Sequence, residues 1–173
     1  MKTLYRLGGS VAQFLRKKTR RRFLYLCALL LLAFADFLFL GLARRTFVFY
    51  SIDNHNPVAE DRMVAKTGSR ESDIKRYVEE ALLGPVALDS APLFPRGTRL
   101  ASLLYRDGVV YADLSESAAL GAPEGPGVFA ALSALYGGVK RNFSYVKDMR
   151  LFIAGREAYP EKFRELFGSY ADI

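Results

Sequence analysis

Apolar and polar residues follow one another along this chain in two different ways, and the change falls near residue 45. Residues 23–43 form a nearly continuous apolar run, whereas the rest of the chain shows short amphipathic segments. At 1.5 Å per residue, a helix over this run spans roughly 30 Å, the thickness of the hydrocarbon core of a bilayer. The pattern therefore predicts one transmembrane helix over residues 23–43, followed by a folded domain over residues 46–173.

Basic residues flank the apolar run unequally. Six Lys or Arg residues lie within residues 16–22, and only Arg44 and Arg45 follow the run closely. The positive-inside rule then places residues 1–22 in the cytoplasm and the folded domain outside the cytoplasmic (inner) membrane. Signal-peptide cleavage after Ala43 is the alternative, because small side chains stand at the required spacing there. The apolar region of a signal peptide usually runs about 7–15 residues, so the longer run favours a retained signal anchor.

One acidic residue, Asp36, interrupts the apolar run. An acid near the centre of a membrane helix costs about 2.5–3.5 kcal/mol on insertion scales, which the apolar neighbours can offset. Two interpretations remain open. Asp36 either contacts another helix or a polar partner within the membrane, or it is a tolerated acid without a role.

The charge distribution follows the same boundary. Residues 1–45 contain ten of the 25 Lys and Arg residues and a single acid, so the rest of the chain is close to neutral. That part has no stripe of basic residues, and a nucleic-acid partner is not expected. The single cysteine, Cys27, excludes an intramolecular disulfide.

Strand and turn signals recur through the folded domain. The Asp107-Gly108 dipeptide between two β-rich runs predicts a tight hairpin. Alternation along the second of these runs predicts that one of its faces is buried. Strands are predicted over residues 46–53, 62–66, 99–106, 109–115 and 149–157.

Three apolar stripes at helical spacing predict helices. The first has Ser72 as its candidate N-cap and ends at Gly84-Pro85, the second contains Gly137-Gly138, which is expected to weaken or end it, and the third starts at Pro160. The order β-(β)-α-ββ-α-β-α predicts a two-layer α+β domain with helices packed on a mostly antiparallel sheet. The residues expected on the buried helix faces are Ile74, Tyr77, Val78, Ala81, Leu82, Val128, Leu132, Leu135, Tyr136, Val139, Phe163, Leu166 and Phe167.

Four short segments stand in a specific order along the folded domain. The segments are Leu82-Leu83-Gly84-Pro85, Phe94-Pro95-Arg96-Gly97-Thr98, Val110-Tyr111-Ala112-Asp113-Leu114-Ser115 and Phe152-Ile153-Ala154-Gly155. Their order and spacing resemble those of the GerMN domain, named from sporulation and spore-germination proteins. The resemblance covers about residues 47–157 and implies an extracytoplasmic, membrane-tethered, non-enzymatic domain similar to the ring-building modules of secretion and sporulation complexes. Many members of this family carry two such domains, and this chain has one. The glycines and prolines of the segments are expected to have structural roles.

Catalytic side chains form no recognisable constellation. His55 is the only histidine, and the acids Glu60 and Asp61 lack the spacing of a calcium-binding loop. Asp113 and Glu116 form the one carboxylate pair that keeps a hydrolase open as an alternative. The chain is therefore predicted not to be an enzyme and to need no metal or cofactor.

The predicted function is that of a membrane-anchored extracytoplasmic interaction or scaffold protein of the bacterial cell envelope. Its expected partners are the membrane and either other envelope proteins or further copies of itself. The alternative is a binding module for a wall glycan, a peptide or a small ligand, with peptidoglycan as one such contact. In that alternative, the loop over residues 86–98 contributes Phe94 and Arg96 to a groove.

Overall fold

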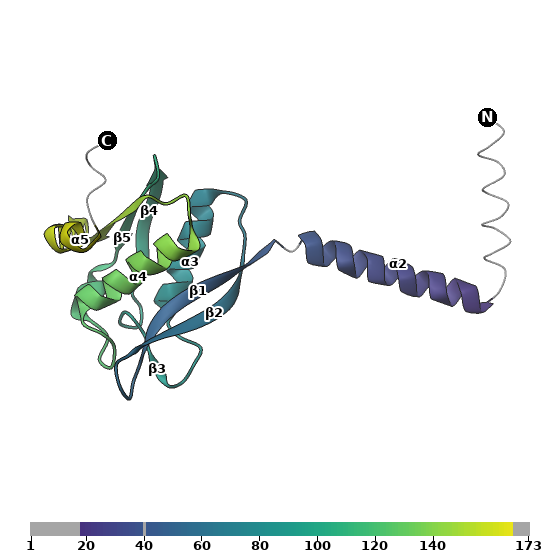
Figure 1. The fold of residues 1–173 in the computed structure, drawn as a ribbon, viewed down its shortest axis with the longest axis horizontal. Coiled ribbons are helices and arrows are strands. Elements are labelled where there is room, and N and C mark those ends of the chain that lie inside the picture. Colours follow the sequence, from purple (N-terminus) through teal and green to yellow (C-terminus); the bar gives the residue numbers. More distant parts are fainter. Residues whose placement is uncertain (1–17, 40, 168–173) are drawn as a thin grey trace. The chain divides into compact units, whose positions relative to one another are not determined.

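The computed structural model describes residues 18–39 and 41–167 (Figure 1). The chain divides into two units, a helical one and, from Leu42 onward, a compact domain that mixes helices and strands. This domain confirms the predicted α+β class. The elements in chain order are α2 (Lys18–Phe39), β1 (Leu42–Ser51), β2 (Pro57–Ala65), α3 (Arg70–Leu83), β3 (Ser90–Ala91), β4 (Leu100–Arg106), β5 (Val109–Leu114), the 3₁₀ helix η1 (Glu116–Leu120), α4 (Val128–Asn142), β6 (Asp148–Ile153), β7 (Arg156–Glu157) and α5 (Pro160–Phe167).

Helix α2 covers most of the apolar run, but it ends earlier than the predicted helix. Leu42 and Ala43, expected in the last turn of the helix, instead begin β1, where they pair with the end of β2. Across the residues that are described, no helix reaches the combined length and hydropathy of a membrane span. Residues 1–17 and the side chain of Asp36 lie outside the described part of the chain.

The domain contains two sheets instead of the single sheet predicted. One has the order β2-β1-β3 and is antiparallel throughout, and the other has the order β4-β5-β6-β7. In the second sheet β5 and β6 are parallel. Their connection passes through η1 and α4, and a crossover of this length returns the chain to the same end of the sheet. The other strand pairs of the described domain are antiparallel, so the prediction of mostly antiparallel pairing is confirmed.

Helices α3 and α4 pack against each other, α3 contacts β4, and α4 contacts β6 and β1. The Asp107-Gly108 turn joins β4 to β5 as predicted, with φ values of 53° and 89° that suit a two-residue hairpin. One face of the second sheet is buried in the core, and its side chains alternate with exposed or half-buried ones. These buried side chains are Val110, Ala112, Leu114, Met149 and Leu151.

Helix α3 begins earlier than predicted. Its N-cap is Ser69, whose hydroxyl oxygen accepts a hydrogen bond from the N–H of Ser72 at 3.1 Å. The prediction of Ser72 as the cap is therefore wrong, because Ser72 already lies within the first turn. The acids Glu71 and Asp73 lie in the same turn, where their negative charges interact favourably with the positive end of the helix dipole. The helix ends as predicted at Gly84, whose φ of 91° favours glycine strongly.

Helix α4 continues through Gly137-Gly138, which corrects the expectation that this pair weakens or ends it. The hydroxyl of Tyr77 on α3 explains the glycine at position 138, because a Cβ there would lie 2.2 Å from Tyr77 Oη. Glycine therefore permits a close approach of α4 to α3. An added Cβ at Gly137, by contrast, would meet no atom within 4 Å.

At Thr46, the edge of β1 that faces away from β2 is closed by α4. The N–H of Thr46 donates to Asn142 Oδ1 at 2.9 Å, and Asn142 Nδ2 donates to the carbonyl of Thr46 at 2.7 Å. Tyr77 Oη donates to the same carbonyl at 3.0 Å, and its ring stacks on Phe47 with 4.5 Å between centroids. Burial raises the pKa of the Tyr77 hydroxyl, which therefore remains a neutral donor.

The substitution Gly138→Ala is expected to lower the free energy of unfolding by roughly 1–3 kcal/mol, because overpacking displaces buried side chains. Tyr77 cannot yield easily, since its ring is stacked and its hydroxyl is hydrogen bonded. Gly137→Ala is the matched control and is expected to raise stability by about 0.5–1 kcal/mol through the higher helix propensity of alanine. Urea unfolding followed by circular dichroism compares the two variants. Equal effects of the two substitutions would contradict the contact.

Candidate functional site

The family-like segment at the end of α3 carries exposed apolar side chains as well as a turn. Gly84 ends the helix and Pro85 is half-buried, so both have the structural role expected of them. Leu83 is 80% exposed, and Val86 and Leu88 beyond the turn are 75% and 98% exposed. We call Leu83, Val86 and Leu88 the apolar loop. Single exposed apolar residues are normal, but three within six residues are typical of a contact surface.

Arg62 on β2 connects the turn of the apolar loop to the domain by hydrogen bonds. Its Nε donates to Glu60 Oε1 at 2.5 Å, and its Nη2 donates to the carbonyl of Gly84 at 2.7 Å. The N–H of Val86 donates to Glu60 Oε2 at 3.1 Å. Burial disfavours the charged carboxylate of Glu60, but the hydrogen bonds from Arg62 and Val86 outweigh it and lower its pKa. The loop is thus held by charge-assisted hydrogen bonds from both sides.

Two buried rings complete this cluster. The guanidinium carbon of Arg62 lies 4.9 Å from the ring centroid of Phe47 and 5.3 Å from that of Phe49. The Arg62 side chain is only 14% exposed, so it contributes packing as well as charge. Sequence reasoning missed this cluster. The sequence did contain one indication of this ion pair. Glu60 and Arg62 are two residues apart, so they lie on the same face of a strand.

The loop before β4 does not form the groove that the binding-module alternative requires. Phe94 is 1% exposed and belongs to the core, whereas Arg96 is exposed to solvent. Gly97 has a φ of 89°, and both the N–H and the hydroxyl of Thr98 donate to the carbonyl of Pro95, at 3.1 and 2.8 Å. These contacts close a turn, so Phe94 cannot line a groove beside Arg96.

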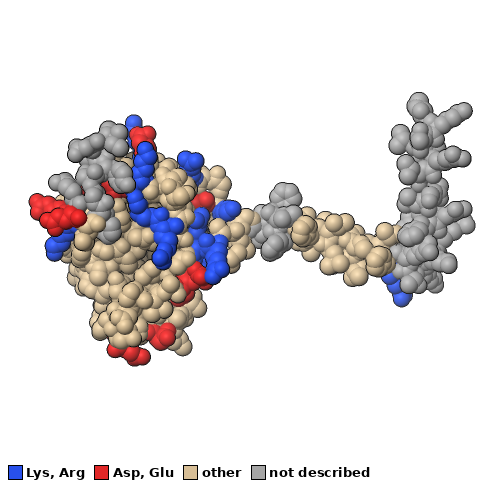
Figure 2. Space-filling view, viewed as in Figure 1, with Lys and Arg blue, Asp and Glu red and all other residues tan. Residues whose placement is uncertain are grey.

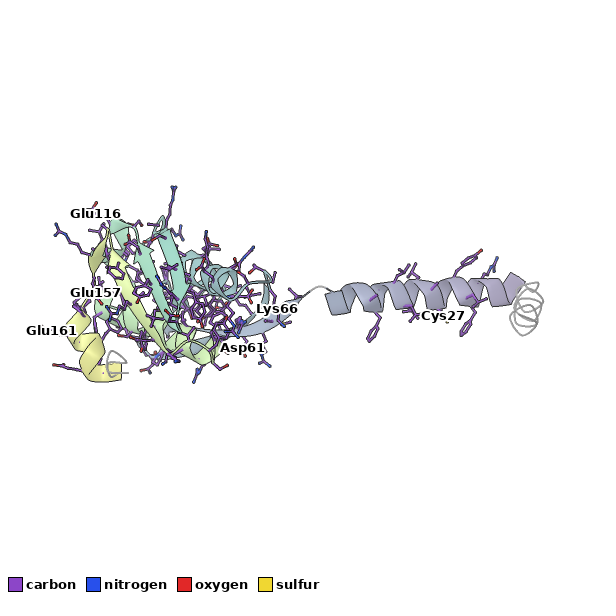
Figure 3. The ribbon with its side chains drawn as sticks, turned by 90° about the horizontal axis from the view of Figure 1, so that it is seen from above. Cys27, Asp61, Lys66, Glu116, Glu157 and Glu161 are labelled. Carbon is purple, nitrogen blue, oxygen red and sulfur yellow. The ribbon has the colours of Figure 1, made fainter. Side chains whose placement is uncertain are left out.

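Two polar side chains of the family-like segments accept hydrogen bonds from backbone N–H groups of other elements. Asp113 Oδ1 accepts from the N–H of Gly155 at 3.1 Å, and Ser115 Oγ accepts from the N–H of Arg99 at 3.0 Å. Ser115 precedes η1 but makes no side-chain cap to it. Glu116 lies exposed on η1 at the periphery of the domain (Figure 3). Asp113 is therefore engaged with the β6–β7 turn and shares no hydrogen bond with Glu116.

Other residues with metal-binding chemistry are dispersed or already engaged. His55 is exposed in the turn between β1 and β2. Asp61 accepts hydrogen bonds of 2.6 Å from both Arg44 and the hydroxyl of Thr46. Within residues 18–39 and 41–167, no three side chains of the metal-ligating types come together.

The comparisons with known proteins agree with this fold. The family model described as Germane, sporulation and spore germination, matches residues 48–159. The first GerMN domain of the sporulation protein GerM from Bacillus subtilis is 20% identical, with a TM-score of 0.55 over 68% of this chain and 86% of that chain. The tandem GerMN domains of the same protein give 20% identity and a TM-score of 0.54, over 68% of this chain and 41% of theirs.

The chain thus spans less than half of the tandem-domain structure. The search of curated proteins found no match to this chain. The solved structures support the fold, and the family match covers most of the chain, including all four segments on which the resemblance rests. The chain belongs to the Germane family of sporulation and spore-germination domains.

Proposed function

We propose that this protein is a membrane-anchored extracytoplasmic interaction protein of the bacterial cell envelope, which acts by protein–protein contact. The observation that carries the proposal is the apolar loop. Leu83, Val86 and Leu88 are exposed, yet Arg62 and Glu60 hold the turn that bears them in one conformation. A preorganised apolar surface loses little conformational entropy on binding and so favours association.

The membrane anchor is the second part of the proposal. It is supported by the length of the apolar run, by the excess of basic residues before it and by the surface of α2. Phe23, Leu29, Leu31, Leu32 and Phe34 are each more than half exposed on this helix. In water such a surface is unfavourable, whereas lipid would cover it.

Membership of the Germane family connects the chain with sporulation and spore germination. The proposed partners are other envelope proteins or further copies of the chain. Contact with peptidoglycan is the alternative, and the exposed Arg96 is the residue that would serve it. Retention of the purified protein on wall sacculi, with loss on Arg96→Ala, would favour that alternative.

Replacement of Leu83, Val86 and Leu88 by serine is expected to reduce recovery of the crosslinked partner from membranes about tenfold or more, as loss of an apolar hot spot does. The measurement is in-cell crosslinking of the full chain followed by purification. Leu120→Ser is the matched control, because Leu120 is 81% exposed on η1, away in sequence from the apolar loop. All four side chains are exposed, so stability should change little. Undiminished recovery of the partner would count against the apolar loop.

The anchor is tested by fractionation of cells that express the full chain. The protein is expected in the membrane fraction after a high-salt wash, and protease added to spheroplasts is expected to digest the domain but spare residues 1–22. Removal of residues 1–41 should release a folded domain. Recovery of a soluble protein that lacks its first 43 residues would show that the segment is a cleaved signal.

A further inference from the structure

A hollow of about 390 Å³ lies between β1 and α4 and opens to solvent. This volume falls within the roughly 300–1,000 Å³ that is usual for ligand pockets. We call the hollow the β1–α4 groove. None of the residues of the apolar loop lines it. Its lining includes Val48, Tyr50, Ser133, Ala134, Gly137 and Arg141.

The hydrogen-bonding pattern of β1 directs one residue's backbone toward this groove. In an antiparallel pair, successive residues direct their N–H and C=O groups to opposite sides of the strand. Thr46 directs both groups to Asn142, and Tyr50 pairs with Ala91 of β3 on the same side. Val48 lies two residues from each, so its N–H and C=O point to this side as well.

That position beside Val48 is vacant among the described residues. β3 pairs with β1 only at Tyr50 and Ser51, and no described residue hydrogen bonds to the N–H or C=O of Val48. Pro57, opposite Tyr50 on β2, supports this register independently, because proline has no N–H and suits a pair without ladder hydrogen bonds. The strand edge therefore has a gap one residue wide, where one residue of an extended segment of another chain can pair with the backbone of Val48.

The walls of the groove indicate the chemistry of that segment. On α4, Ala134 and Gly137 are small, and the space around Gly137 is open, so a peptide can approach the helix closely. Arg141 stands in the last turn of α4, is exposed, and forms no ion pair with any described residue. Figure 2 shows Lys and Arg side chains gathered on this face of the domain. An acidic group therefore complements the groove.

We infer that the β1–α4 groove binds an extended, acidic peptide segment of a partner protein. One residue of the segment pairs with the N–H and C=O of Val48, and another places a carboxylate on Arg141. This second contact surface is independent of the apolar loop. It extends the proposed function by naming the kind of partner segment that the domain recognises.

The test uses the full chain in detergent and a randomised hexapeptide pool displayed on beads. Selected peptides are expected to contain an Asp or Glu at one position and β-branched residues around it. Arg141→Ala should weaken binding of a selected peptide about fivefold, as loss of an exposed ion pair does. Gly137→Phe should abolish binding because the ring fills the groove, whereas Gly137→Ala should leave most of it. N-methylation of the peptide nitrogen that pairs with Val48 should also abolish binding.

Failure to enrich any sequence, or enrichment that survives Gly137→Phe, would overturn the inference. Circular dichroism shows whether the Gly137→Phe variant is folded. If it is unfolded, Arg141→Ala alone tests the groove, since this exposed side chain contributes nothing to the core. The serine variant of the apolar loop should keep peptide binding, so failure of the groove and failure of the apolar loop are separate results.

Discussion

Closure of the β1 edge at Thr46 is the constraint on which the rest of the domain depends. The side-chain amide of Asn142 pairs with the N–H and C=O of Thr46 as a neighbouring strand would, and Tyr77 adds a third hydrogen bond from α3. A half-buried backbone group left unpaired costs about 1–3 kcal/mol, so these contacts fix α3 and α4 against the strand. The close approach follows, and with it the requirement for glycine at position 138.

The apolar loop and the β1–α4 groove arise in the same way. In each, hydrogen bonds to neighbouring backbone groups fix the position of residues that stay exposed. At the end of α3, Arg62 and Glu60 satisfy the backbone of the turn and leave the apolar loop exposed. At β1, Asn142 satisfies Thr46 and β3 satisfies Tyr50, which leaves Val48 with an open edge between them. Both surfaces lie beside rigid elements, so a partner meets groups that are already in place.

Local sequence patterns predicted much of the domain correctly. The helical stripes placed Ile74, Tyr77 and Val78 in the core, and the Asp107-Gly108 dipeptide predicted the hairpin. Short-range signals failed where a distant residue decided the outcome. The local sequence at Gly137-Gly138 predicts a weakened or ended helix, because the approach of Tyr77 is not visible in it. The parallel pairing of β5 with β6 likewise depends on the path of a long crossover.

The candidate surfaces also combine features that local sequence predicts with features that depend on distant contacts. The family-like segments are local, and local patterns were enough for the family, the turn glycines and the buried faces of α3 and α4. The prediction of a buried Leu166 on the last helix is wrong, since this side chain is 62% exposed. Only the folded structure shows that Phe94 is buried, that Arg62 hydrogen bonds to the turn of the apolar loop, and that β3 pairs with β1 at Tyr50 and Ser51 without reaching Val48. The physical reason is that periodicity depends on neighbours within a few residues, whereas these features need contacts such as that between Thr46 and Asn142, which are 96 residues apart.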